Sequence, residues 1–215
     1  MAQPIPAQLP AKTNNPVLEN PVVVIGQQFI ATYPVDLVIK SKWSPTEGNF
    51  GVTDVNGAVI FSIKGKFFSI HDRRILLDAT GHPLVSLKQK VLSAHRRWQV
   101  FRGGDEGHDK DLVFSVRKSS FMQFKTELSV FLANNTKEEV PDFKVKGSWL
   151  ETSCTIYLGD SNTIVAQMHR KETAASVFLD KDCFGVTVYP NMDYAFIVAL
   201  VVILQEINAD RNGED

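Results

Sequence analysis

A run of ten consecutive apolar residues, AFIVALVVIL from Ala195 to Leu204, most constrains what this chain can fold into. A helix of this length extends about 15 Å, whereas crossing the hydrocarbon core of a membrane takes about 20 apolar residues. Asp193 precedes the run, and Gln205 and Glu206 follow it, so a spanning helix would have to carry a charge into the lipid. We therefore expect no transmembrane span. A helix that is apolar on every face must then be enclosed by protein.

The chain before this run has a pattern typical of β-structure. Short apolar or alternating segments are separated by Asn, Asp and Gly turn signals. Two units, DVNGAVIFSIKGK (54–66) and DATGHPLVSLKQK (78–90), share Asp-x-x-Gly followed by a strand that ends in Lys-x-Lys, and GDSNTIVAQMHRK (159–171) is a looser version. Because Asp closes an Asx turn and Gly supplies a positive φ angle, each unit is predicted to be a β-hairpin.

These hairpins and the remaining strands predict an all-β fold with one helix. The other predicted strands are 36–40, 48–54, 73–78, 97–101, 112–116, 127–133, 142–146, 153–158 and 184–189; segment 119–125 fits a helical turn or a bulged strand. Eight strands form a barrel just filled by side chains, so about 12 strands leave room for a helix. We expect a closed antiparallel barrel of about 12 strands around the C-terminal helix, with Asn191 or Asp193 as the helix cap.

Composition bounds the domain organisation and the partners. Five of the ten prolines lie in the first 21 residues, which predicts an extended, disordered tail over 1–20 and a single domain over 21–215. A net charge of −1 predicts no direct binding to nucleic acid.

Local signals bear on the compartment. The N-terminal segment lacks the pattern of a secretory signal, and the two cysteines lack CxxC spacing. We expect a monomer in the cytoplasm or nucleus that is not secreted.

Motifs of catalysis are absent from the sequence. It contains no GxSxG, no phosphate-binding GxxxxGK[ST] and no dinucleotide-binding GxGxxG. The five histidines show no HxH or HExxH spacing. We therefore expect no catalytic residues, no metal site and no cofactor.

Four segments carry a resemblance to a known family: DLVFSVRKS (111–119), DFKVKGSW (142–149), IYLGDSNTIVAQMHRK (156–171) and FGVTVYPNMDYAFIVALVVILQEI (184–207). They resemble the plant LURP-one-related proteins, a branch of the tubby-like superfamily that also includes phospholipid scramblases. The resemblance extends from about residue 21 onward and implies a barrel around a hydrophobic helix. Tubby domains bind phosphoinositide head groups and hold transcription regulators at the plasma membrane.

The resemblance therefore implies a non-enzymatic module tethered peripherally to membrane phosphoinositides, with a role in plant defence or stress signalling. The alternative is a protein-interaction scaffold without a lipid ligand, whose protein partners the sequence does not identify. Scramblase-like lipid transport is a third hypothesis, which the absence of a Cys-rich lipidation segment disfavours.

The predicted ligand site lies on lysine-bearing strands. In tubby, a Lys-x-Arg pair on one strand forms much of the phosphoinositide site, and the similar segment here, SLKQK, supplies Lys88 and Lys90. Lysine at the second position loses the bidentate fork of arginine but keeps the charge. Strand alternation turns Ser86, Lys88 and Lys90 toward solvent and Val85 and Leu87 inward.

The same alternation pairs Lys64 with Lys66 in the first hairpin unit, and a basic segment follows the second unit. The predicted phosphoinositide site comprises Lys88, Lys90, Lys64, Lys66, Arg96 and Arg97. The alternative interpretation is an ordinary solvated surface, because lysines on exposed strand positions also discourage association between sheets.

Overall fold

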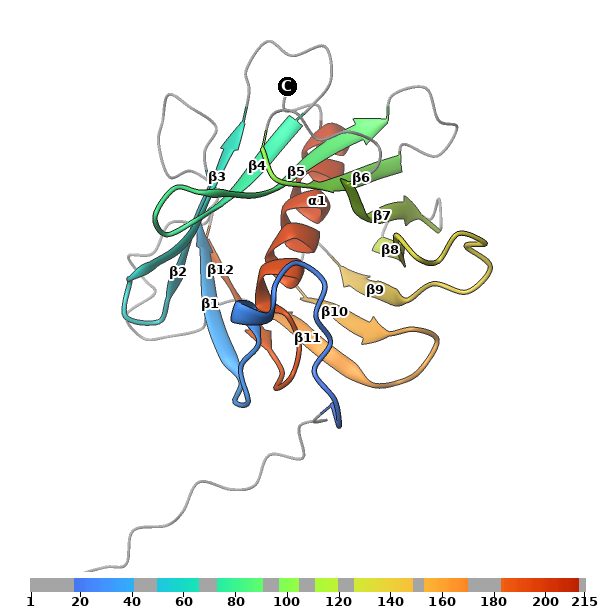
Figure 1. The fold of residues 1–215 in the computed structure, drawn as a ribbon, viewed down its shortest axis with the longest axis horizontal. Helices are drawn as coiled ribbons and strands as arrows, with labels where there is room; N and C mark the ends of the chain where they lie inside the picture. The colour runs from blue at the N-terminus through green and yellow to red at the C-terminus, as the bar shows by residue number, and fades with distance from the viewer. Residues whose placement is uncertain are drawn as a thin grey trace, which may run out of the picture.

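The structure is a computed structural model that describes residues 18–40, 50–65, 73–90, 97–104, 111–119, 126–148, 153–169 and 183–212. Twelve antiparallel strands form one closed barrel around a single helix (Figure 1). The strands are β1 (Val35–Lys40), β2 (Phe50–Asp54), β3 (Val59–Gly65), β4 (Arg73–Asp78), β5 (Pro83–Lys90), β6 (Arg97–Arg102), β7 (Leu112–Lys118), β8 (Thr126–Leu132), β9 (Phe143–Ser148), β10 (Ser153–Leu158), β11 (Ile164–His169) and β12 (Cys183–Val188). Each strand pairs with its neighbours in sequence, and β12 closes the barrel against β1. The predicted fold class is confirmed.

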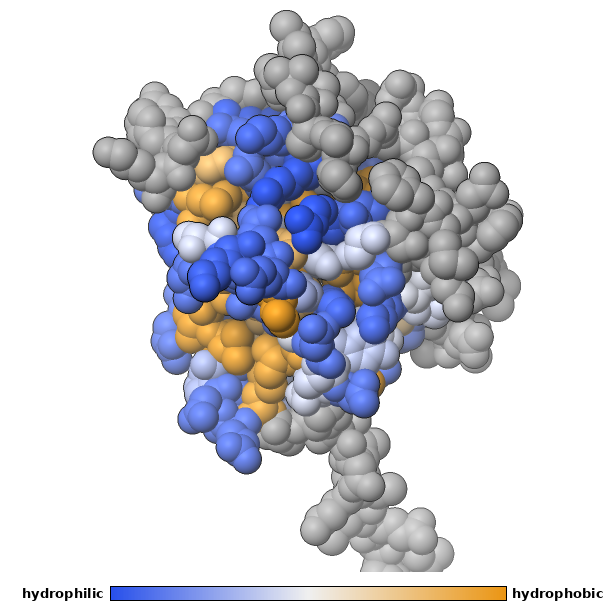
Figure 2. Space-filling view, turned by 90° about the vertical axis from the view of Figure 1, so that its right-hand side faces the viewer, coloured by the Kyte–Doolittle hydropathy of each residue, from blue (hydrophilic) through white to orange (hydrophobic). Residues whose placement is uncertain are grey.

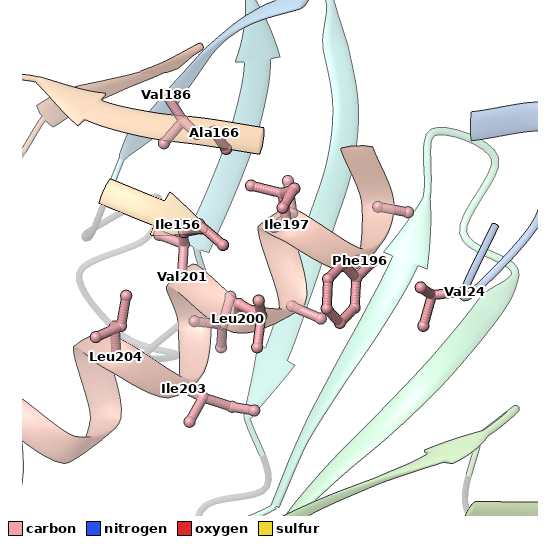
Figure 3. Close-up of a cluster of buried hydrophobic side chains, with 14 of the residues drawn as sticks. Val24, Ile156, Ala166, Val186, Phe196, Ile197, Leu200, Val201, Ile203 and Leu204 are labelled. Carbon is pink, nitrogen blue, oxygen red and sulfur yellow. The ribbon is translucent and has the colours of Figure 1, made fainter. Parts of the chain in front are cut away.

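The helix α1 (Tyr194–Asn212) runs through the barrel, as the red ribbon in Figure 1 shows. Every residue from Ala195 to Leu204 is at most 1% exposed. Side chains project from the helix in several directions in Figure 3, where Ile197 and Val201 lie on the side of β10, β11 and β12. The apolar run is therefore the core of the barrel.

Phe196 packs between two strands of the barrel wall. Its ring centroid lies 4.9 Å from that of Phe114 on β7 and 4.9 Å from that of Phe143 on β9. Edge-to-face and tilted contacts at this distance stabilise aromatic pairs beyond the burial of their area. The helix is thus fixed against the wall on this side.

Asp193 caps the N-terminus of the helix. Its Oδ1 accepts a hydrogen bond of 3.1 Å from the amide of Phe196, which confirms one of the two predicted caps. Its Oδ2 accepts bonds from the amides of Val24, Ile25 and Gly26, at 3.1, 2.7 and 3.0 Å. One fully buried carboxylate therefore joins the helix to the N-terminal segment.

The N-terminal segment covers this end of the barrel. It contains a short 3-10 helix, η1 (Gln27–Phe29), and it forms isolated β-bridges from Val22 to Met192 and from Ile30 to Asp193.

Asn191, the other predicted cap, instead adopts a left-handed turn with φ of 66°, and its side-chain amide donates to the carbonyl of Leu18 at 2.7 Å. Leu18 is itself buried, although the sequence placed it within the tail. Residues 1–17 lie outside the described part of the chain.

An ion pair holds the other half of the helix. Arg74 on β4 points into the barrel, and its Nε and Nη2 donate to the two carboxylate oxygens of Glu206 at 2.8 and 2.9 Å. The neighbouring position on β3 is Gly65, where an added Cβ would collide with the Arg74 guanidinium. Two parallel hydrogen bonds fix the rotation and height of the helix more strictly than apolar contacts can.

The hairpin turns form by the predicted chemistry. Asp54 Oδ1 accepts from the amides of Asn56 and Ala58 at 2.9 and 2.8 Å, and Gly57 has φ of 88°. The second unit repeats the arrangement: Asp78 Oδ1 accepts from the amides of Thr80 and His82, and Gly81 has φ of 89°. In the looser third unit a serine, Ser161, bonds the turn instead. Of the segment left ambiguous, 120–125 lies outside the described residues.

We predict that Ala199→Asp lowers the free energy of unfolding by several kcal/mol, because it places an unpaired charge in the core of the barrel. Urea denaturation followed by circular dichroism measures this loss. Ala79→Asp, at an exposed position of the β4–β5 turn, is the matched control and should leave stability nearly unchanged. Equal stability of the two variants would show that the helix is not the core.

We also predict that Asp193→Ala lowers the free energy of unfolding by about 3 kcal/mol, because buried amides lose their acceptor. Hydrogen exchange should accelerate at Val24, Ile25 and Gly26. The control is Asp36→Ala, which removes an exposed carboxylate that accepts one bond, from Thr187. Unchanged exchange at the three amides in Asp193→Ala would contradict the role assigned to this carboxylate.

Candidate functional site

The described members of the predicted site lie on neighbouring strands of the barrel's outer face. Lys64 is on β3, Lys88 and Lys90 are on β5, and Arg97 is on β6. Lys90 lies directly opposite Arg97 in the β5–β6 register. Lys66 and Arg96, the other two predicted residues, lie outside the described part of the chain.

Arg73, a residue that the sequence reasoning missed, connects Lys64 with Lys88. Arg73 lies on β4 directly opposite Lys88, and Lys64 lies opposite Ile75, two positions along the same strand. Strands are spaced about 4.8 Å apart, so these three cations occupy adjoining positions across β3, β4 and β5. The Arg73 guanidinium donates from Nη2 to the carbonyl of Gly104 at 2.6 Å.

Arg117 on β7 is the second residue that was missed. Trp98 pairs with Val116, so the next position of the register sets Arg97 against Arg117. Burial, together with the positive charge of Arg117, lowers the pKa of Arg97 from its ordinary value. Lys90, Arg97 and Arg117 therefore form a row of cations across three adjacent strands. We call the larger set the basic belt; it comprises Lys64, Arg73, Lys88, Lys90, Arg97 and Arg117.

Aromatic rings support two of these cations. Lys88 Nζ lies 5.1 Å from the ring centroid of Phe101, and Arg117 Cζ lies 4.9 Å from that of Phe131. Both rings are almost fully buried, and the charged group of each cation lies over a ring in a cation–π contact. Figure 2 shows the face on the right-hand side of Figure 1, where hydrophilic residues are spread between smaller hydrophobic areas.

The burial of Ser86 differs from the prediction for this strand. The alternation places it on the outer face with Lys88 and Lys90, but its exposed fraction is 0%. The short side chain lies beside the large ring of Phe101, which is opposite to it on β6. The cationic face of β5 therefore begins at Lys88.

The belt contains an intramolecular acid. Glu138, in the loop between β8 and β9, accepts an ion-paired hydrogen bond from Arg97 Nη2 through its Oε1. Its Oε2 lies 4.0 Å from Arg117 Nη1. The same Arg97 nitrogen donates to Ser115 Oγ at 2.7 Å. Two arginines thus converge on one carboxylate.

The chain is similar to known proteins in sequence and in fold. A family model described as LURP-one-related matches residues 35–205 of the chain. The chain belongs to the LURP-one-related family.

Relatives in Arabidopsis thaliana match most of the LURP-one-related chain. Protein LURP-one-related 15 is 53% identical over 189 residues, covering 87% of this chain and 87% of the relative. Protein LURP1 is 46% identical over 191 residues, covering 88% and 92%. A crystal structure of an Arabidopsis thaliana protein matches with a TM-score of 0.69 and 46% identity, covering 86% of this chain and 98% of that one.

A second basic position of this LURP-one-related barrel lies on β9 and β10. A small pocket is lined by Lys144, Lys146, Tyr157 and the turn from Gly159 to Asn162. Lys144 is ion-paired with Asp160, and Lys146 Nζ lies 5.9 Å from the centroid of Tyr157. The carboxylate of Asp160 therefore offsets one of the two charges at this pocket.

Other chemistry has little support among the described residues. No group of three or more His, Cys, Asp or Glu side chains there could hold a metal ion. Within the same ranges, no helix has the length and apolar character needed to cross a membrane. Neither cysteine forms a disulfide; Cys154 is buried and Cys183 is half-buried.

We predict that Cys154 resists alkylation in the folded protein. Burial raises the pKa of its thiol to about 11, so the reactive thiolate is scarce at mildly alkaline pH. Iodoacetamide labelling of a Cys183→Ser variant, followed by mass spectrometry, reports on Cys154 alone. Labelling should occur only after denaturation in urea, and rapid labelling of the folded variant would contradict the burial of this thiol.

Proposed function

We propose that this LURP-one-related protein is a non-enzymatic binding module whose basic belt binds multivalent phosphate, the chemistry of phosphoinositide head groups. The row formed by Lys90, Arg97 and Arg117 carries the proposal. Like charges directly opposite each other on adjacent strands destabilise a sheet. Glu138 offsets part of this repulsion at the two arginines, and a ligand with several negative charges would also reach Lys90, which adds to its affinity.

The side chains of the belt suit phosphate. Arginine presents a planar fork that binds phosphate oxygens in pairs, and lysine adds a compact charge. Phe101 and Phe131 hold the charged groups of Lys88 and Arg117 in place before any ligand binds. Binding therefore loses less side-chain entropy than it would on an unsupported surface.

The position of the belt favours a membrane-bound source of phosphate. The six cations lie on the convex outer surface of the barrel rather than inside it. Such a surface can approach the anionic cytoplasmic leaflet, where each nearby lysine or arginine contributes about 1 kcal/mol. We propose a protein that is cytoplasmic and peripheral at the plasma membrane, and the family resemblance extends this proposal to plant defence or stress signalling.

We predict that Lys88→Ala/Lys90→Ala weakens binding to vesicles containing phosphatidylinositol 4,5-bisphosphate by about thirtyfold, because two cations near the surface are lost. Co-sedimentation measures this binding. The matched control is Lys144→Ala/Lys146→Ala on β9, which removes the same charge from the same alternating pattern four strands away. Binding by the control should stay close to that of the unaltered protein.

The experiment separates the alternatives. Competition with soluble inositol trisphosphate distinguishes a free phosphate ligand from a lipid head group, and vesicles with phosphatidylserine alone measure general attraction to anionic lipid. Equal loss in both double variants would indicate unspecific charge attraction. Absence of binding by the unaltered protein would reject the lipid ligand and favour a protein-interaction scaffold.

A further inference from the structure

Glu138 is ion-paired within the row of cations that carries the proposed function. Its carboxylate contacts Arg97 directly and lies 4.0 Å from Arg117. The Arg97 Nη2 atom that it contacts also donates to Ser115 Oγ, so this nitrogen has two acceptors. Any anion that reaches this pair of arginines must displace Glu138 or share the arginines with it.

The loop holds Glu138 in this position. Its φ angle of 52° is in the left-handed region, which is uncommon for a residue other than glycine. The amide of Glu138 donates to Asn135 Oδ1 at 3.1 Å, and Asn135 Nδ2 donates to the carbonyl of Val140 and to Asp142 Oδ2. Asp142 Oδ2 also accepts from the amide of Leu132 at the end of β8. The carboxylate is therefore tethered through a hydrogen-bonded loop.

Tethering makes Glu138 an effective competitor. A tethered group acts at a high effective concentration, so it competes well with any free ligand that offers the same contacts. One phosphate offers the two arginines little more than one carboxylate does. A ligand with two or more phosphates can place one of them at the arginines while another contacts Lys90, which lies opposite Arg97 about one strand spacing away.

We infer that Glu138 is an intramolecular competitor that sets how tightly a ligand must bind the basic belt. It weakens every phosphate ligand at the arginine pair by the same factor, so only head groups with additional phosphate contacts remain bound. This inference rests on the proposed phosphoinositide function, to which it adds the residue that opposes binding.

The test compares Glu138→Gln with Glu139→Gln. Glutamine keeps the size of the side chain and removes its charge. Glu139 is the adjacent, exposed residue, so the second variant changes the net charge of the same loop without altering the described contacts of Arg97 and Arg117. Matched urea denaturation of the two variants establishes that both are folded.

Affinities are measured on vesicles containing either phosphatidylinositol 4-phosphate or phosphatidylinositol 4,5-bisphosphate. Glu138→Gln should strengthen binding to both lipids by about fivefold, the value of one surface ion pair. Because each lipid must displace the same carboxylate, the ratio of the two affinities should stay nearly constant. Glu139→Gln should leave both affinities close to those of the unaltered protein.

Two results would overturn the inference in distinguishable ways. If the unaltered protein binds the bisphosphate lipid and Glu138→Gln strengthens binding no more than Glu139→Gln does, Glu138 is not a competitor and the proposed function stands. If the unaltered protein and both variants fail to bind either lipid, the proposed function fails and the inference fails with it.

Discussion

The enclosure of an apolar helix by a closed sheet is the constraint on which the rest of this structure depends. Residues 195–204 are buried on every face, so the strands must supply a continuous apolar inner wall. Charged contacts then fix the helix along its axis: Asp193 bonds the N-terminal segment at one end, and Glu206 bonds Arg74 at the other. Apolar packing alone would allow the helix to slide or rotate, whereas these directional bonds specify one position.

Closure also determines the outer surface. Alternate residues of each strand must point away from the helix, and on β5, β6 and β7 several of those positions are cations. The register of the backbone hydrogen bonds then aligns Lys90, Arg97 and Arg117, although their charges repel. The stability of the core thus maintains a charge arrangement that would separate on a flexible segment. The proposed binding surface is held in place in this way without a ligand.

Local patterns in the sequence predicted much of the fold. The apolar run identified the enclosed helix, and the Asp-x-x-Gly turns at Asp54 and Asp78 formed by the expected bonds. Alternation placed Lys64, Lys88 and Lys90 on the outer face. Pairing between strands was not predictable to one residue, so the positions of Arg73 and Arg117 were missed; the β6–β7 register even shifts between Val100 and Phe101. The contact of Glu138 was missed because a loop of ten residues, 133–142, precedes β9 and its path depends on tertiary bonds.

The place of the helix in the chain order has a consequence for biosynthesis. The strand that closes the barrel, β12, pairs Val188 with Val35, and the helix follows it. While a ribosome synthesises the chain from its N-terminus, all twelve strands are made before the helix whose side chains fill their interior. An apolar inner wall that is exposed until residues 194–204 leave the exit tunnel favours aggregation. The barrel therefore cannot complete its core until the last element of its fold has been synthesised.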